Sequence, residues 1–217
     1  MKRLLIVMGG LTCLMCASVA YAATLNGTNG SDTIIGTTGD DKIDAKAGVL
    51  DTVLGLSGDD TIRGGPGPDS IQGDGTCPRH TKNVDLCNQN AGSGNDDIRG
   101  DSGEDVIVGG RGNDKISGGS GVDTLDGGRG RDRVDGGSAS DTVYGGPSND
   151  TVHGGTGSDM VNGGPGRDRL FGDGGNDTID ARDGERDVIS CGSGTDTVHA
   201  DDKDSVSRNC ERVDAVR

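Results

Sequence analysis

The chain has 217 residues and a formal net charge of −15, and its composition is unlike that of an ordinary globular protein. Glycine accounts for 43 residues, aromatic residues for only 1%, and tryptophan is absent. So few large apolar side chains exclude a conventional hydrophobic core. The acidic charge argues against nucleic acid or anionic lipid as a partner, because both are bound through Lys and Arg. An acidic chain of this kind attracts cations instead.

Residues 1–22 do not share this composition. They begin with Lys2 and Arg3, continue with an apolar stretch from Leu4 to Val19, and end in Ala20-Tyr21-Ala22. This three-part pattern predicts a secretory signal peptide that is cleaved after Ala22. A membrane or lipid anchor is the weaker alternative, because the apolar stretch is short and lacks a lipobox. We therefore expect a secreted protein without a membrane span after cleavage, with the periplasm and the cell surface left open as destinations.

Cleavage leaves four cysteines, which are Cys77, Cys87, Cys191 and Cys210. An even number of cysteines in an exported chain favours disulfides, and four cysteines allow three connectivities. The simplest of the three pairs Cys77 with Cys87 and Cys191 with Cys210, each closing a local loop. Zinc is the competing interpretation, but no histidine or second cysteine pair stands at ligand spacing near either pair.

The rest of the chain consists of a nine-residue sequence repeat, Gly-Gly-x-Gly-x-Asp-x-aliphatic-x. We call its nine positions posts. The sixth-post Asp recurs 17 times, at steps of nine residues apart from two steps of ten and one of 27. The aliphatic residue at the eighth post follows each Asp by two residues, from Ile34 to Val198. The 17 sixth-post residues are Asp32, Asp41, Asp51, Asp60, Asp69, Asp96, Asp105, Asp114, Asp123, Asp132, Asp141, Asp150, Asp159, Asp168, Asp177, Asp187 and Asp196.

Each repeat predicts a glycine-rich turn followed by a very short strand, in which the aliphatic side chain points inward and its two neighbours point outward. Helix is excluded by the density of glycine. Two repeats make one coil of 18 residues, so the array predicts an all-β solenoid with two parallel sheets and an aliphatic ladder between them. Asp114 and Asp132 are expected to share one edge of this solenoid, with Asp123 at the opposite edge.

The array is expected to cover residues 23–207. The 27-residue step contains an 18-residue segment, 73–90, which carries Cys77 and Cys87. Its length equals two repeats, so later copies stay in phase with earlier ones, and we interpret it as a disulfide-bearing loop inserted into the array. Residues 191–217 break the period and carry the other cysteine pair, which predicts a disulfide-stapled C-terminal cap of the kind that solenoids need.

The aliphatic ladder is too small to stabilise the array without a further source of stabilisation. One aliphatic residue in nine buries too little surface to offset the entropy of ordering the chain, and the Asp side chains stack in two like-charged columns. A divalent cation that prefers oxygen ligands meets both needs. Calcium accepts six to eight carboxylate and carbonyl oxygens in flexible geometry, whereas magnesium requires a tight octahedron and softer metals favour Cys or His. The sequence therefore predicts bound calcium.

The repeat resembles the RTX (repeat-in-toxin) nonapeptide of hemolysin-type calcium-binding proteins, and copies such as "GGRGNDKIS" (109–117) and "GGTGSDMVN" (154–162) match it at every fixed post. The resemblance implies a right-handed parallel β-roll that binds Ca²⁺ between adjacent turns and folds outside the cell. We set aside Asp51 and Asp187 because their copies carry an extra residue. The implied calcium ligands are Asp32, Asp41, Asp60, Asp69, Asp96, Asp105, Asp114, Asp123, Asp132, Asp141, Asp150, Asp159, Asp168, Asp177 and Asp196, with Gly110, Gly112, Gly119, Gly121, Gly128, Gly130, Gly155 and Gly157 in the turns.

The function expected from these observations is calcium binding by an exported roll that folds on calcium and has no catalytic domain. The chain contains neither an HExxH metalloprotease motif nor a GxSxG nucleophile elbow. Two alternatives stay open, namely an adhesive or surface-binding module and a calcium-dependent accessory to a separate secreted enzyme or toxin. The sequence does not identify a protein or polysaccharide partner.

Overall fold

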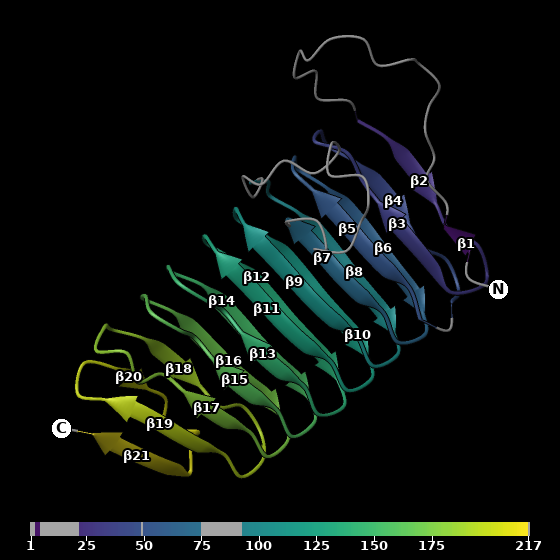
Figure 1. The fold of residues 1–217 in the computed structure, drawn as a ribbon. Helices are drawn as coiled ribbons and strands as arrows, with labels where there is room; N and C mark the ends of the chain where they lie inside the picture. The colour runs from purple at the N-terminus through teal and green to yellow at the C-terminus, as the bar shows by residue number, and fades with distance from the viewer. Residues whose placement is uncertain (1–2, 5–21, 49, 75–92, 217) are drawn as a thin grey trace.

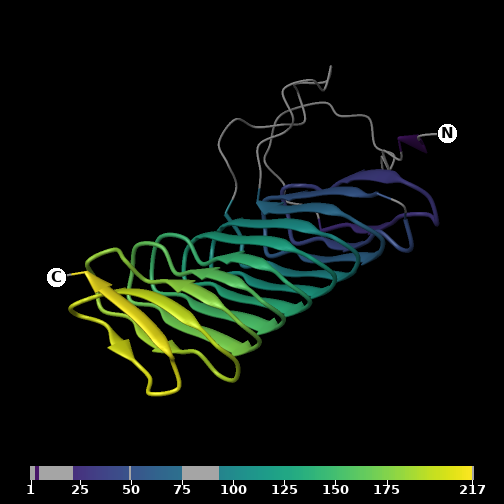
Figure 2. The ribbon, with the colours of Figure 1, turned by 90° about the horizontal axis from the view of Figure 1, so that it is seen from below.

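The computed structural model of the chain describes residues 3–4, 22–48, 50–74 and 93–216. In these residues the chain winds into an elongated solenoid whose successive strands alternate between two parallel sheets (Figures 1 and 2). The described residues contain strands and turns but no helix. Strand neighbours such as Lys115 and Arg133 are one coil, or 18 residues, apart. The predicted all-β fold with two parallel sheets and an 18-residue coil is therefore confirmed.

Each sheet contains every second strand of the chain. The strands of the first sheet, called sheet A, are β1 (Arg3–Leu4), β3 (Asp32–Ile35), β5 (Thr52–Leu56), β7 (Ser70–Asp74), β9 (Val106–Arg111), β11 (Thr124–Arg129), β13 (Thr142–Tyr144), β15 (Met160–Asn162), β17 (Thr178–Asp180), β19 (Thr197–Asp201) and β21 (Arg212–Val216). The strands of the second sheet, called sheet B, are β2 (Thr24–Asn26), β4 (Lys42–Asp44), β6 (Thr61–Pro66), β8 (Asp97–Ser102), β10 (Lys115–Ser120), β12 (Arg133–Ser138), β14 (Thr151–Thr156), β16 (Arg169–Gly174), β18 (Val188–Ser190) and β20 (Ser205–Val206).

The strands form where the seventh to ninth posts alternate between outward and inward side chains. In β10, Lys115 is exposed, Ile116 is buried and Ser117 is half-buried. The eighth-post residues of both sheets stack into one aliphatic core between the sheets. Leu25 also joins this core and lies inside the predicted array, 23–207, although the 17 counted repeats begin with that of Asp32. Its repeat was missed because Ala23 stands near the post where the other copies carry Asp.

The long insertion leaves the phase of the array intact. Strand β6 pairs directly with β8 and β7 pairs with β9, so the coils before and after the insertion stack as if they were consecutive. Of the predicted insertion 73–90, Gly73 and Asp74 belong to β7. The Oδ2 atom of Asp74 accepts a hydrogen bond from the Gly94 amide at 2.9 Å, which joins the two ends of the insertion. The predicted Cys77–Cys87 disulfide lies outside the described residues, as does most of the predicted signal peptide.

The C-terminal end of the roll contains the second predicted disulfide. Cys191 and Cys210 are bonded, with 5.2 Å between their Cα atoms, so this pairing is confirmed. Beyond it, β21 adds to β19 as the last strand of sheet A. Glu211 stands where the next Asp of the repeat would be expected, and its Oε2 atom accepts the Asp196 amide at 2.9 Å. The end of the roll thus keeps the hydrogen-bond pattern of the repeat with different residues.

Removing this disulfide is expected to loosen the C-terminal coil. The Cys191→Ser and Cys210→Ser double variant should lose about 2–4 kcal/mol of unfolding free energy, because the bond restricts the unfolded chain. Denaturant titration at saturating calcium measures the loss, and Ser207→Ala, which changes a nearby hydroxyl and no covalent bond, is the control. Equal stability of the double variant and the control would contradict the stapling role.

Candidate metal centre

The sixth-post Asp residues form two buried columns along the edges of the roll. Each Asp lies at or directly before the start of a strand, where a turn enters a sheet. We call the turns that lead into sheet A edge A and those that lead into sheet B edge B. Edge A carries Asp32, Asp51, Asp69, Asp105, Asp123, Asp141, Asp159, Asp177 and Asp196, and edge B carries Asp41, Asp60, Asp96, Asp114, Asp132, Asp150, Asp168 and Asp187. None of these residues is more than 3% exposed.

In every one of these residues except Asp32, one carboxylate oxygen joins successive coils. The Asp114 amide donates to Oδ1 of Asp132 at 2.8 Å, and the Asp105 amide donates to Oδ1 of Asp123 at 2.8 Å. The same bond spans the insertion, where the Asp60 amide donates to Oδ1 of Asp96. These bonds confirm that Asp114 and Asp132 share an edge and that Asp123 lies on the other one. They also place Asp51 and Asp187, which sequence analysis had set aside, in the same columns as the rest.

Apart from Asp32 and Asp41, whose Oδ2 atoms accept hydrogen bonds from Thr28 and Thr37, these residues have no hydrogen-bond donor on the other carboxylate oxygen. Among the described residues, the Oδ2 atom is buried without a partner in Asp51, Asp60, Asp69, Asp96, Asp105, Asp114, Asp123, Asp132, Asp141, Asp150, Asp159, Asp168, Asp177, Asp187 and Asp196. A buried carboxylate oxygen without a partner is costly, and such groups normally have a hydrogen-bond donor or a cation beside them. A row of them at one repeated position indicates a common missing partner.

At most of the orphaned Oδ2 atoms, a carbonyl oxygen of the next coil converges on the same place. A Cβ atom added to Gly109, the first-post glycine of the Asp114 turn, would lie 2.5 Å from Oδ2 of Asp114 and 2.5 Å from the carbonyl oxygen of Gly127. The same is found at Gly118, where the neighbours are Oδ2 of Asp123 at 2.4 Å and the Gly136 oxygen at 2.6 Å. We call this oxygen-lined space beside a first-post glycine a cradle.

The chemistry of the cradle fits calcium. It offers one carboxylate oxygen and one backbone carbonyl oxygen from adjacent coils, and both are ligands that calcium prefers. In the described part of the chain, no group of three or more His, Cys, Asp or Glu side chains lies close enough to hold a metal. A cation in these turns would therefore depend on backbone carbonyls for most of its protein ligands, which suits calcium and not zinc. The cradle residues would hold the ion between one coil and the next.

The first-post carbonyls were missed by sequence analysis, which proposed the second- and fourth-post glycines as the turn ligands. The structure gives those glycines another role. Gly110, Gly112, Gly128 and Gly130 all have positive φ, and a Cβ atom on Gly130 would lie 1.5 Å from the Gly112 carbonyl oxygen of the preceding coil. These posts are glycine because stacked turns approach too closely for a side chain. Whether their carbonyls also bind calcium stays a prediction.

Two residues that replace glycine at the fourth post keep the backbone shape of glycine. Ala139 and Ser148 replace glycine and adopt φ values of 90° and 121°. This region is unfavourable for residues with a Cβ atom. The repeat therefore imposes its turn on these residues, and both positions carry backbone strain.

Among the turns that the structure describes, three have a side chain at the first post. Ala45 precedes Asp51, Ala181 precedes Asp187 and Cys191 precedes Asp196, and all three first-post residues are at most 2% exposed. These residues stand where the other turns have a glycine without a Cβ atom, so the three turns have no glycine cradle. Ala45 and Ala181 begin the two turns with an extra residue, which gives a structural basis for treating Asp51 and Asp187 separately. The same feature separates Asp196, which sequence analysis grouped with the other ligands.

Burial changes the protonation of the columns. It raises the pKa of Asp96 from 3.8 to about 8, and that of Asp105 and Asp114 to about 7, while hydrogen bonds from backbone amides oppose this rise. The protonated carboxyl is favoured because a charged one would be buried beside others of its kind. Without a cation, these residues therefore hold protons near neutral pH.

The raised pKa values predict that acid partly replaces calcium. The folded roll binds more protons than the unfolded chain, so its stability without calcium is greatest below the ordinary Asp pKa and is lost as the pH rises through the raised values. Lowering the pH from about 8 to about 5 in calcium-free buffer should increase the strand signal in circular dichroism. Calcium affinity should fall over the same range, because protons compete for the carboxylates. A calcium-free strand signal that is constant or falls with acid would contradict this prediction.

The fold and its repeated turn define a parallel β-roll built from nonapeptide repeats. A family model that represents four copies of the RTX calcium-binding nonapeptide repeat matches residues 20–49, 51–75, 90–125, 117–152, 126–161 and 153–185. These matches cover more than half of the chain, which therefore belongs to the RTX calcium-binding repeat family, whose repeats bind calcium. A search of curated proteins gave no match. Within the described residues, no helix has the length and apolar character needed to cross a membrane.

Proposed function

We propose that this protein is an exported, non-enzymatic calcium-binding roll that folds when calcium enters its cradles. The observation that carries the proposal is the row of buried Oδ2 atoms without donors, most of which lie beside a carbonyl oxygen of the next coil. Calcium supplies the positive charge that these oxygens lack. It also links adjacent coils, so binding and stacking of the coils reinforce each other.

The two carboxylate oxygens and the eighth-post side chains have different roles in the proposed function. The Oδ1 atoms keep successive turns in register through amide hydrogen bonds, such as the bond from Asp123 to Asp141 at 2.8 Å. The Oδ2 atoms and first-post carbonyls are the proposed ligands, in the turns of Asp60, Asp69, Asp96, Asp105, Asp114, Asp123, Asp132, Asp141, Asp150, Asp159 and Asp177. In Asp32 and Asp41, which the sequence also proposed as ligands, Oδ2 already accepts hydrogen bonds from Thr28 and Thr37. The Asp168 turn differs, because only its own carboxylate lies beside Gly163. The eighth-post side chains exclude water from the space between the sheets.

Calcium titration by calorimetry tests the binding part of the proposal. We expect several calcium ions per chain, with magnesium at the same concentration unable to replace them, because magnesium does not adapt to irregular oxygen cages. A chain that binds no calcium, or that binds magnesium equally well, would overturn the proposal.

Export has a separate test. The proposed signal peptide predicts that the protein recovered outside the cytoplasm begins at Ala23, and N-terminal sequencing measures this directly. Recovery of the chain with Met1 intact would contradict the proposed processing while leaving the calcium proposal untouched. The proposed absence of catalysis is supported by the missing HExxH and GxSxG motifs.

A further inference from the structure

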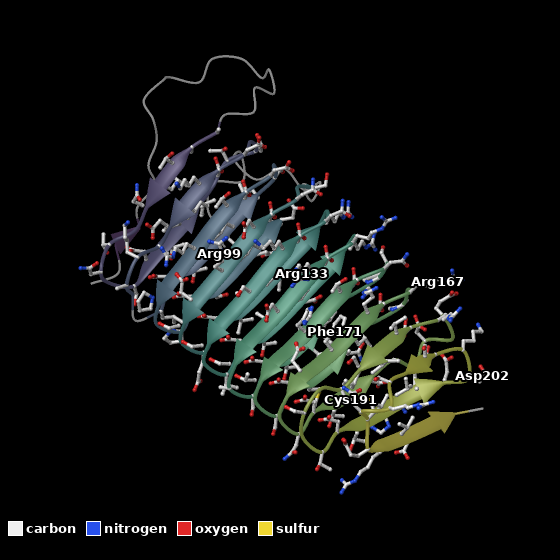
Figure 3. All side chains as sticks on the ribbon, turned by 180° about the vertical axis from the view of Figure 1, so that it is seen from behind. Arg99, Arg133, Arg167, Phe171, Cys191 and Asp202 are labelled. Carbon is white, nitrogen blue, oxygen red and sulfur yellow. A yellow bond between two sulfur atoms is a disulfide. The ribbon has the colours of Figure 1, made fainter. Side chains whose placement is uncertain are left out.

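From residue 93 to residue 200, the basic residues lie on one side of the roll. Every Lys and Arg in this segment lies on the outer face of sheet B, in an edge B turn, or at the last residue of a sheet A strand that runs into such a turn. In Figure 3, Arg99 and Arg133 lie over the strands and Arg167 lies at their edge. The full set is Arg99, Arg111, Lys115, Arg129, Arg131, Arg133, Arg167, Arg169, Arg182 and Arg186. This segregation produces a local positive surface on a chain whose net charge is −15.

The centre of this surface is a group that we call the basic corner, formed by Arg111, Lys115, Arg129, Arg131 and Arg133. All five residues are exposed. Register places Arg111 directly beside Arg129, and Lys115 directly beside Arg133, on neighbouring strands. Like charges at paired positions destabilise a sheet, so the folding of the roll does not favour this arrangement.

Few carboxylates neutralise the basic corner. In the described part of the chain, Lys115 makes one long ion pair with Asp97, at 3.7 Å, and the four arginines of the corner make none. Elsewhere on the roll, exposed arginines do find partners, as Arg182 does with Asp180 at 2.7 Å. The guanidinium groups of the corner are therefore available to an external anion.

The other side of the roll shows that the repeat does not require basic residues at these posts. The third posts that hold Arg111 and Arg129 on edge B hold Ser120 and Ser138 on edge A. The seventh posts that hold Lys115 and Arg133 in sheet B hold Val106, Thr124 and Thr142 in sheet A. Because the backbone is the same on both sides, the difference is a property of the surface and not of the fold.

The geometry of the corner suits a linear polyanion. Neighbouring strands are about 4.8 Å apart, so the basic side chains recur in a line along the roll, and each guanidinium can bind a sulfate or carboxylate through two hydrogen bonds. Single-stranded nucleic acid would need aromatic rings to stack on, but Phe171 is already stacked against His153, with 4.4 Å between ring centroids. An anionic membrane would need apolar side chains to insert, and the corner contains none.

We propose that the basic corner binds a linear acidic polysaccharide, with anionic groups along the glycan contacting arginines of successive coils. Calcium in the edge B cradles would strengthen this binding, because it neutralises Asp114 and Asp132 directly behind the corner. The acidic net charge of the chain argues against nucleic acid and anionic lipid as partners, but the local charge of this one side favours an anionic glycan.

The proposal is tested with the full calcium-loaded chain and dextran sulfate as the probe, at a fixed excess of calcium and physiological ionic strength. The corner variant carries Arg111→Ser, Arg129→Ser and Arg133→Thr, residues that the repeat itself uses at these posts. We expect it to lose about tenfold or more in affinity, as measured by calorimetry. The control carries Lys46→Ser, Arg208→Ser and Arg212→Thr, which changes the net charge equally, and its affinity should change less than about twofold.

Several results would overturn the proposal. They are equal losses in the two triple variants, equal binding of neutral dextran, no binding of dextran sulfate by the unmodified chain, and tighter binding of single-stranded DNA or anionic phospholipid vesicles. Circular dichroism of each variant in calcium verifies that the roll is folded. Failure here with calcium binding intact would leave the proposed function standing, because the corner residues are not cradle residues.

Discussion

Removing calcium with a chelator at neutral pH is expected to abolish most of the strand signal in circular dichroism and to expand the chain in light scattering. The reason is the repeated Oδ2 atom, which is buried beside a carbonyl oxygen with no donor in reach. Each coil would then bury two carboxyl groups that must either take up a proton or carry an uncompensated charge, and one aliphatic residue per repeat buries too little surface to offset this cost. The loss should be cooperative, because each coil is supported mainly by its neighbours.

Restoring calcium to the chelated chain should return both signals. Magnesium at the same concentration is the matched control, and it should leave the chain expanded. A chain that keeps its full strand content in chelator would show that the coils stack without cations. The oxygen atoms of the cradles would then not form calcium-binding sites.

The second large effect is expected from adding one methyl group inside a cradle. In Gly118→Ala the new Cβ atom would lie 2.4 Å from Oδ2 of Asp123 and 2.6 Å from the Gly136 carbonyl oxygen. Both distances are far below van der Waals contact, and one neighbour is backbone that cannot easily move. The φ angle of Gly118 is not in the positive range, so the effect measures the cradle and not backbone strain.

We expect Gly118→Ala to bind one calcium fewer and to lose about 3 kcal/mol of unfolding free energy in calcium, a value typical of overpacking a filled site. Ser120→Ala, at an exposed position of the same strand, is the matched control and should leave both quantities unchanged. Unaltered calcium stoichiometry in Gly118→Ala would show that the ion does not occupy the cradle. The stability change alone would then report only crowding of the turn.

Much of the fold could be predicted from the sequence because its determinants are local. The spacing of Asp114 and Ile116 within one repeat fixes a turn and an inward side chain, and the nine-residue step then fixes the alternation between sheets. The first-post cradle could not be predicted in this way. It depends on how the Gly127 carbonyl of one coil approaches the Asp114 carboxylate of the coil before it, and no single repeat contains that contact.

Two other features could have been found by reading alternate copies separately. In the sequence, the first-post glycine is replaced at four turns, by Ala45, Ala91, Ala181 and Cys191. Marking them would have pointed to the three turns without a glycine cradle and also to Asp96, which has Gly73 beside it instead. Alternate copies also separate the two edges, so the arginines at 111, 129, 131 and 167 would have fallen into one group. The net charge of the chain concealed that group, because it averages over both sides.

The turn at which the insertion leaves the roll has a consequence for how such proteins can change. Asp69 bonds to Asp105 across it as closely as neighbouring coils bond elsewhere, at 2.7 Å. Stacking of the coils on either side therefore does not depend on how many residues lie between Asp74 and Gly94. A graft of unrelated sequence between these two points would extend the chain without rewriting any repeat. The roll can thus act as a scaffold that holds an inserted segment at a fixed position along its length.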